Sequence, residues 1–193
     1  MDKMKVVCIG DSLTYGYGVS NKENWISFIN KKNKLNFINK GINGDTTGGM
    51  LSRFYRDVID DKPQYVLIMG GTNDFITGNS LGAVQANIMA MVHQAYHNKI
   101  IPIIGTSIKA DVENIREDWK AIADFKEVDF KMAEYNKWLN KFCSVFKIAD
   151  IDFCTEFKNR TSSKYSSFFI DGLHPTKEGH EIIADIVYDF IMR

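Results

Sequence analysis

The sequence predicts an α/β protein in which a parallel β-sheet is covered by helices on both faces. Short apolar runs alternate along the chain with longer segments of helical periodicity, which is the pattern of repeated βαβ units. The apolar runs are continuous rather than alternating with polar residues, as is typical of strands buried on both faces. The 193-residue length predicts one domain, spanning residues 1–193.

Five apolar runs are predicted to form the strands of this sheet. In chain order they are Lys5–Ile9, Leu35–Asn39, Tyr65–Met69, Ile100–Gly105 and Phe146–Ile151. Gly10 follows the first run, and a glycine followed by small polar residues indicates a tight turn.

The segments between these runs place hydrophobic residues at helical spacing, so each is predicted to be a helix that packs on the sheet. Their predicted buried faces consist of Trp25, Ile26, Phe28 and Ile29; Met50, Leu51, Phe54, Val58 and Ile59; Val84, Ile88, Met91, Val92 and Ala95; Tyr135, Trp138, Leu139, Phe142 and Val145; and Ile182, Ile183, Ile186, Val187 and Phe190.

One highly charged segment, residues 109–129, follows the fourth predicted strand. Val112, Ile115, Trp119 and Ile122 fall on one helical face there. One interpretation is a surface helix that covers the core. The other is a lid or wall beside a functional site, because the segment leaves the carboxyl end of a strand and long excursions are often functional.

The composition excludes several classes of protein. Hydrophobic residues make up 45% of the chain, enough for a sizeable core. The formal net charge is zero, so neither a nucleic acid nor an anionic membrane surface is expected as a partner. The apolar runs are too short to span a bilayer. No signal peptide is recognised, which predicts a cytoplasmic location unless a leader has been removed. The oligomeric state is not predicted.

Neither the cysteines nor the histidines predict a metal site. The odd number of cysteines and their wide spacing argue against a disulfide framework or a zinc site, and Cys8 reads as a core residue. His93 and His97 have a spacing that can hold a metal, but no third ligand is indicated. His180 is predicted to be a surface or capping side chain of the last helix. The glycine-rich loops match no phosphate-binding fingerprint, so no cofactor is expected.

Ser12 is the first candidate for chemistry, because it follows the first strand directly. Ligands of open α/β sheets bind at the carboxyl ends of the strands. A serine hydroxyl needs a base to act as a nucleophile, and the base needs an orienting partner. His174 follows Asp171 by three residues, so one tight turn can bring the carboxylate to the imidazole. Alone, this stretch is better interpreted as an ordinary loop with local hydrogen bonds.

Two further turns follow the second and third strands, at residues 41–45 and 70–74. Gly44 lies in the first turn and Asn73 in the second. A glycine lets its backbone N–H approach a ligand closely, and an asparagine amide can donate a hydrogen bond to an oxyanion. The strand ends of a parallel sheet gather at one edge, so these turns are expected near Ser12.

These residues resemble the sequence blocks of the GDSL family of esterases and lipases, in its SGNH hydrolase branch. Residues 10–16 resemble the first block, and Gly44 and Asn73 resemble the glycine and asparagine of the second and third. Asp171 and His174 resemble the aspartate and histidine of the fifth block.

The resemblance implies a three-layer, flavodoxin-like fold with five parallel strands in the order 2-1-3-4-5. It also implies that Ser12 is the nucleophile, that His174 is the general base and then acid, and that Asp171 orients His174. The oxyanion hole would consist of the Ser12 and Gly44 backbone N–H groups and the Asn73 side chain.

The chain is therefore expected to be a cofactor-independent serine ester hydrolase that acts on a small or acyl-chain carboxylic ester through an acyl-enzyme. A carbohydrate O-deacetylase, a thioesterase or a lysophospholipase could use the same site, and a flavodoxin-like binding module without catalysis is the alternative from another class. Tyr15, Phe75 and Phe169 are expected to contact the substrate, whose identity and acyl-chain length the sequence does not predict.

Overall fold

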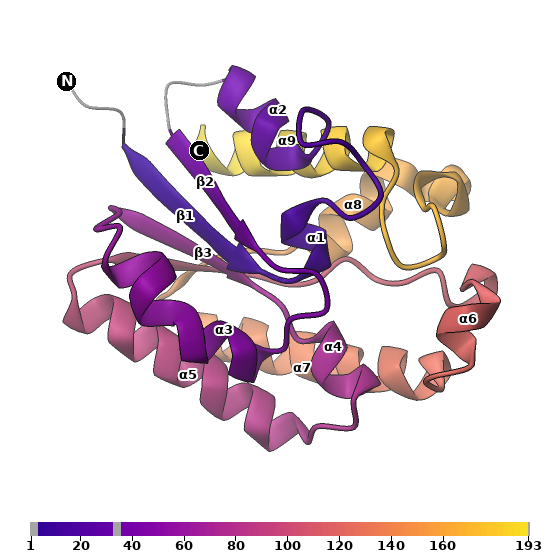
Figure 1. The fold of residues 1–193 in the computed structure, drawn as a ribbon, viewed down its shortest axis with the longest axis horizontal. Helices are drawn as coiled ribbons and strands as arrows, with labels where there is room; N and C mark the ends of the chain where they lie inside the picture. The colour runs from indigo at the N-terminus through magenta and orange to yellow at the C-terminus, as the bar shows by residue number, and fades with distance from the viewer. Residues whose placement is uncertain (1–3, 33–35, 193) are drawn as a thin grey trace.

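The computed structural model describes residues 4–32 and 36–192, and its centre is one sheet of five parallel strands (Figure 1). The strands lie in the order β2-β1-β3-β4-β5, which confirms the predicted fold class. Their bounds are Lys5–Gly10 for β1, Asn36–Gly41 for β2, Tyr65–Met69 for β3, Ile101–Gly105 for β4 and Ala149–Ile151 for β5.

Helices cover both faces of the sheet and form the outer two of three layers (Figure 1). One face carries α3 (Thr47–Phe54) with its π-helical extension η1 (Tyr55–Ile59), α5 (Leu81–His97) and α7 (Phe125–Phe146). The other carries α2 (Trp25–Lys32), α8 (Phe153–Thr161) and α9 (Lys177–Ile191).

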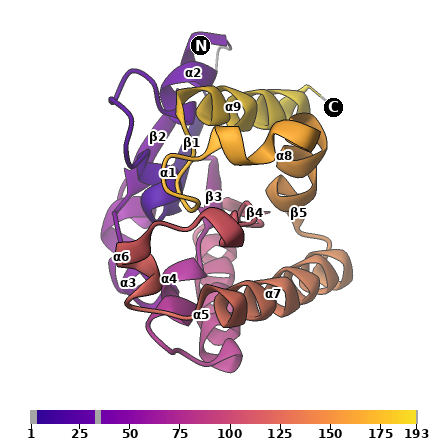
Figure 2. The ribbon, with the colours of Figure 1, turned by 90° about the vertical axis from the view of Figure 1, so that its right-hand side faces the viewer.

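Short helices gather at the carboxyl edge of the sheet, which faces the viewer in Figure 2. They are α1 (Ser12–Tyr15), α4 (Thr72–Ile76) and α6 (Glu117–Lys120). The 3-10 turns are η2 (Val112–Asn114) and η3 (Ser162–Phe168). The functional residues that the sequence predicts lie on this edge.

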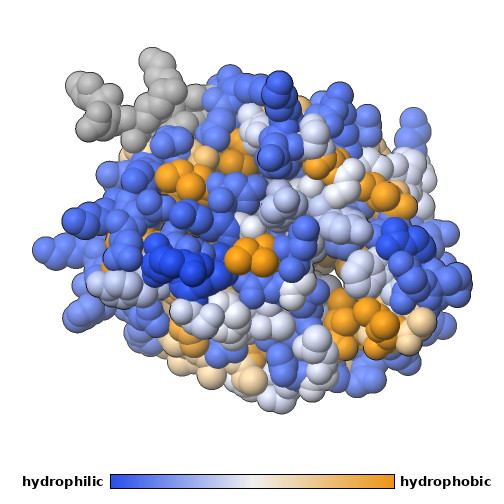
Figure 3. Space-filling view, viewed as in Figure 1, coloured by the Kyte–Doolittle hydropathy of each residue, from blue (hydrophilic) through white to orange (hydrophobic). Residues whose placement is uncertain are grey.

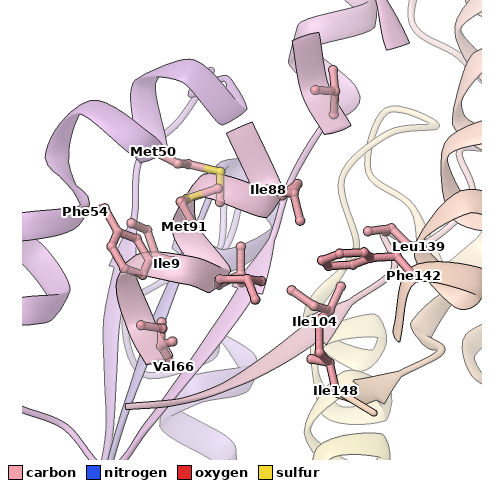
Figure 4. Close-up of a cluster of buried hydrophobic side chains, with 14 of the residues drawn as sticks. Ile9, Met50, Phe54, Val66, Ile88, Met91, Ile104, Leu139, Phe142 and Ile148 are labelled. Atoms are coloured by element: carbon pink, nitrogen blue, oxygen red, sulfur yellow. The ribbon is translucent and has the colours of Figure 1, made fainter. Parts of the chain in front are cut away.

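The core consists of two main hydrophobic clusters, one on each face of the sheet. Val7 and Ile9 of β1 contribute to the first, and Val6 and Cys8 contribute to the second. Successive side chains of a strand point to opposite faces, so one strand supplies both clusters. Figure 4 shows the first cluster, where side chains of α3, α5 and α7 pack on those of the strands.

The last strand is shorter than predicted, because the helix before it is longer. The sequence predicts a strand over Phe146–Ile151, whereas α7 continues to Phe146 and β5 begins at Ala149. Lys147, at φ 54°, ends the helix in the left-handed conformation. Val145, predicted on the buried face of this helix, is 63% exposed. Leu35, the predicted start of the second strand, lies outside the described residues, and that strand continues to Gly41.

The charged segment 109–129 does not form the single amphipathic helix that its spacing suggests. It comprises η2, α6 and the first turn of α7, with extended backbone at Ile115 and Arg116 between the first two. Asp124 caps α7 by accepting hydrogen bonds from two backbone N–H groups, so a new helix starts there. Ile115 is buried but Ile122 is 60% exposed, so the predicted apolar face is not continuous.

The surface in Figure 3 is largely hydrophilic and carries separate, small hydrophobic patches. Within residues 4–32 and 36–192, no helix combines the length and apolar character needed to cross a bilayer. His180 is fully buried on α9, which corrects the prediction of a surface side chain.

Candidate active site

Ser12 stands at the first position of α1, directly beyond the end of β1. The carboxylate of Asp11 caps this short helix, because its Oδ1 accepts the Leu13 backbone N–H at 2.9 Å. The carbonyl of Leu13 in turn accepts the indole N–H of Trp25 at 3.1 Å. These contacts hold the turn from both sides and leave the Ser12 residue 8% exposed.

His174 lies in a loop that Asp171 organises. The Oδ1 atom of Asp171 accepts the backbone N–H groups of His174 at 2.8 Å and Leu173 at 3.1 Å. Ile170 donates its backbone N–H to the His174 carbonyl at 2.8 Å, which closes the loop. The tight turn predicted from the three-residue spacing is therefore present.

Ser12, His174 and Asp171 form one hydrogen-bonded chain. The Nε2 atom of His174 is 3.0 Å from the Ser12 Oγ, and its Nδ1 is 2.9 Å from the Asp171 Oδ2. A neutral imidazole with its proton on Nδ1 donates to the carboxylate and leaves Nε2 to accept the serine proton. All three residues are buried. Such an arrangement can activate a serine hydroxyl as a nucleophile and orient the histidine as its base.

The carboxyl of Asp171 is suited to orient the histidine because it stays ionised. Burial alone would raise its pKa, but the hydrogen bonds from the ring and backbone N–H of His174 and from the Leu173 N–H outweigh burial. They hold the pKa of Asp171 well below its usual value.

Gly44 and Asn73 lie beside each other near this chain. The amide Nδ2 of Asn73 donates to the carbonyl of Asp45 at 2.9 Å, the residue after Gly44. Gly44 has φ 75°, a left-handed conformation that glycine adopts without strain. Among the described residues, no acceptor takes the backbone N–H of Ser12 or Gly44. Together with the second N–H of Asn73, these donors can receive a negatively charged oxygen.

Arg53 holds the strand ends behind these turns in place. Its guanidinium donates to the carbonyls of Gly10 at 3.0 Å and Lys40 at 2.7 Å, at the ends of β1 and β2. It also pairs with the carboxylates of Asp45 and Asp57, at 2.7 Å and 2.9 Å. Arg53 was not predicted as a functional residue. The sequence showed only that a charged residue stands among the hydrophobic residues of α3.

Two other buried ionisable groups lie near His174. Burial raises the pKa of Asp11 to about 6, although the Leu13 N–H and the positive charge of a protonated His174 oppose the rise. Burial, with His174 nearby, lowers the pKa of His180 to about 4. Between about pH 4 and about pH 6, the Asp11 carboxyl is therefore mostly protonated and the His180 imidazole mostly unprotonated, so both side chains are neutral.

The three residues expected to contact the substrate are placed differently from one another. Tyr15 is 43% exposed, on the short helix that begins at Ser12. Phe75 is 3% exposed and packs edge-on against Tyr135, and Phe169 is 9% exposed and packs on Tyr165. Both phenylalanines belong to the hydrophobic core, and substrate contact by any of the three stays a prediction.

Two aromatic rings flank the imidazole of His174. The ring of Tyr17 is 4.3 Å away and that of Trp119 is 5.8 Å away, measured between centroids. The indole N–H of Trp119 also donates to the Asp171 Oδ2 at 2.9 Å. The sequence predicted Trp119 on an apolar helical face in a segment that could be a lid or wall beside the site, but it did not predict this contact with Asp171.

A small cavity lies mainly between residues 107–110 and α7, and Leu13, Thr72 and Leu173 are also among its lining residues. Neither Ser12 nor His174 lines it. Its volume is about 70 Å³. Across the described part of the chain, no three His, Cys, Asp or Glu side chains are grouped to hold a metal ion.

Comparison with known proteins gives one consistent family. Residues 8–182 match the model of the GDSL-like Lipase/Acylhydrolase family. An arylesterase of Vibrio mimicus is 25% identical over 190 residues, which covers 95% of this chain and 86% of that protein. The esterase TesA of Pseudomonas aeruginosa is 27% identical over 95 residues, 47% of each chain. The crystal structure of a lipolytic G-D-S-L family protein from Veillonella parvula superposes with a TM-score of 0.84 at 25% identity, covering 98% of this chain and 99% of that one.

Proposed function

Because the chain belongs to the GDSL-like lipase/acylhydrolase family and is a carboxylic ester hydrolase, we propose that it cleaves its substrate through an acyl-enzyme on Ser12. The observation that supports this proposal is the hydrogen-bonded chain from Ser12 through His174 to Asp171. These residues match the motifs at which the sequence resembles the family, and they come from the two ends of the chain.

In the first half of the reaction, the Ser12 Oγ attacks the ester carbonyl carbon while His174 Nε2 takes the hydroxyl proton. The carbonyl oxygen becomes negatively charged in the tetrahedral intermediate. The backbone N–H groups of Ser12 and Gly44 and the amide of Asn73 stabilise that charge. His174 then gives its proton to the departing alcohol, and Asp171 stabilises the imidazolium while it exists.

In the second half, water replaces the alcohol. His174 takes a proton from the water, which attacks the acyl carbon, and the same donors stabilise the second oxyanion. Collapse of that intermediate releases the carboxylic acid and returns the proton to Ser12. The cycle needs no cofactor.

The substrate we propose is a carboxylic ester with a small acyl group or an acyl chain. The similarity to an arylesterase favours an ester of a phenol as a first substrate. A carbohydrate O-deacetylase would also transfer a small acyl group and is the second candidate. A thioesterase or a lysophospholipase would use the same residues.

The test of this function is labelling with a serine-directed fluorophosphonate, followed by turnover of p-nitrophenyl acetate. We expect the protein to be labelled and Ser12→Ala to be unlabelled, with kcat lower by on the order of 10⁴ or more. Ser52→Ala is the matched control, because Ser52 is exposed on α3 and donates only to the Gly49 carbonyl. Wild-type turnover by Ser12→Ala would refute the proposal. An unlabelled protein with a flavin absorption spectrum would instead indicate a binding module.

A further inference from the structure

The segment 111–119, which we call the strap, runs across the loop that carries Asp171 and His174. Three hydrogen bonds join the two. The backbone N–H of Asp111 donates to the Gly172 carbonyl at 2.7 Å, and that of Arg116 donates to the Asp171 carbonyl at 3.0 Å. The indole N–H of Trp119 donates to the Asp171 Oδ2 at 2.9 Å.

The strap and the loop also fit each other closely at Gly172. A Cβ on Gly172 would lie 2.7 Å from backbone atoms of Asn114 and Ile115, and the glycine has φ 80°. Both facts require glycine there. Next to it, Ile115 packs with Leu173 and Phe125 in a small hydrophobic cluster separate from the two main clusters. The strap is therefore held against this loop by contacts of its own.

We propose that Trp119 is a positioning residue for the ester hydrolysis, acting through Asp171 on the orientation and basicity of His174. The inference rests on the proposed function. Oδ1 of Asp171 is held by two backbone N–H groups, whereas Oδ2 receives both the His174 Nδ1 and the Trp119 indole. Trp119 is thus the second donor on the oxygen that orients the base.

The indole hydrogen bond has an electrostatic consequence. It draws negative charge from Oδ2, so the carboxylate stabilises the protonated imidazole less than it would with His174 as its only partner. The other charged group near this oxygen is Arg116, whose Nη1 is 3.8 Å away. Among the described residues, Asp11 and His180 also interact electrostatically with His174, and the ring of Tyr17, which hydrogen-bonds Arg116, lies against the imidazole. None of these groups donates the hydrogen bond that the Trp119 indole N–H gives to the Asp171 Oδ2.

Trp119→Phe separates this role from packing, because it keeps an aromatic ring and removes the N–H. Trp138→Phe is the matched control. Trp138 is also half-buried but stacks on Tyr135 and Phe142 of α7, away from His174. With p-nitrophenyl acetate, we expect Trp119→Phe to lower kcat about tenfold with little change in KM, because Asp171 loses one of the donors that fix its carboxylate toward His174.

Two further readouts follow from the charge argument. In Trp119→Phe, the pH at which kcat/KM falls to half of its maximum moves upward by about 0.5, because a more negative Oδ2 favours protonation of His174. The proton resonance of the His174 Nδ1–H, which reports the hydrogen bond to Asp171, also shifts. Trp138→Phe leaves the half-maximal pH and the resonance unchanged.

The inference would be overturned if both the half-maximal pH and the resonance stayed at their wild-type values in Trp119→Phe. If kcat and the melting temperature both fell while the half-maximal pH and the resonance stayed unchanged, Trp119 would have a structural role only. The resonance does not depend on turnover. If the wild type fails to hydrolyse esters, the proposed function fails, and the resonance still decides whether Trp119 acts on the pair of Asp171 and His174.

Discussion

Asn73 has a structural contact beside the role in chemistry that we propose for it. Its Nδ2 carries two hydrogens, and the Asp45 carbonyl accepts one of them. That bond orients the amide and leaves the second hydrogen for the substrate oxygen. The loop after β2 and the loop after β3 are thereby joined at the point where the oxyanion is expected.

Asn73→Ala is expected to lower kcat by roughly 10²–10³ with little change in KM, because the lost donor acts mainly in the transition state. Steady-state kinetics on p-nitrophenyl acetate measure both constants. Asn98→Ala is the control, since Asn98 caps the C-terminal end of α5 and its amide donates to the Gln94 carbonyl. A change confined to KM would instead place Asn73 in ground-state binding.

The activity should depend on pH through His174, which must be neutral to accept the serine proton. We expect kcat/KM to fall as the pH is lowered, because protonation of the imidazole removes the acceptor for the serine proton. Asp171 stays ionised as the pH falls, because its pKa lies well below its usual value. A pH-rate profile measures this, and a flat profile down to about pH 4 would contradict it.

His180 should make the stability of the fold depend on pH. Its pKa falls from 6.5 to about 4 on burial, so between these values the unfolded chain binds a proton that the folded chain does not. Stability contributed by the neutral ring is complete above pH 6.5 and is lost as the pH falls toward 4. The loss relative to His180→Gln is expected to be on the order of 3 kcal/mol.

Urea unfolding of both proteins at several pH values measures this difference. Asp11 acts in the opposite direction, because its raised pKa makes the folded chain bind an extra proton up to about pH 6. Asp11 is present in both proteins, so its contribution cancels. Equal pH slopes for the wild type and His180→Gln would show that His180 does not titrate in this way.

The sequence predicted Ser12, Asp171 and His174 as the reacting residues because each belongs to a short motif at a recognisable strand end. Trp119 and Arg53 could not be predicted in the same way. Each contacts the site through a partner distant in sequence, Asp171 for Trp119 and Gly10 for Arg53. Contacts of this kind depend on how the loops cross, which local patterns do not contain.

At the scale of elements, Arg53 anchors α3 to the ends of β1 and β2. Its side chain is 7% exposed and pairs with two carboxylates and two carbonyls. Arg53→Met would leave the Asp45 and Asp57 carboxylates without this partner in a largely buried place. We expect a loss of unfolding free energy on the order of 3 kcal/mol.

Arg160→Met is the control for this experiment. Arg160 also pairs with two carboxylates, but at the surface between α8 and α9. Exposed ion pairs contribute at most about 1 kcal/mol. Denaturant unfolding measures both variants, and equal losses would show that burial does not decide the value of the Arg53 contacts.

The boundaries of elements were less predictable than their existence. All five strands were expected, because continuous apolar runs identify buried strands. The end of α7 was misplaced because Val145 and Phe146 read as strand or core, yet both are exposed on the last helical turn. The structure of segment 109–129 depends on its packing against Gly172 and Leu173, which lie far along the chain.

At the scale of the whole molecule, the strand order explains why the site forms at one place. β1 lies between β2 and β3, so the turns after these three strands meet around Ser12. The loop with Asp171 and His174 comes from the far end of the chain and closes over the same edge (Figure 2). The proposed chemistry therefore requires residues from both ends of the sequence to meet at this edge of the sheet.

The sharing of β1 between the two main clusters also predicts how the molecule unfolds. Its side chains alternate between the clusters, so neither cluster keeps its shape when this strand leaves the sheet. If residues 1–193 are one domain, as the sequence predicts, both faces should unfold together. The three tryptophans allow a direct test, because Trp25 belongs to one main cluster, Trp138 packs on the other and Trp119 belongs to the strap.

Labelling with 5-fluorotryptophan gives one ¹⁹F resonance for each tryptophan, and each single Trp→Phe variant assigns one of them. We expect the native resonances of Trp25 and Trp138 to disappear at the same urea concentration, because their clusters share β1. The Trp119 resonance should change at the same urea concentration or a lower one. The strap packs on the loop that carries Asp171 and His174, and the hydrophobic cluster that holds it there is small. Separate midpoints for Trp25 and Trp138 would mean that the two faces are independent folding units, contrary to the single domain predicted.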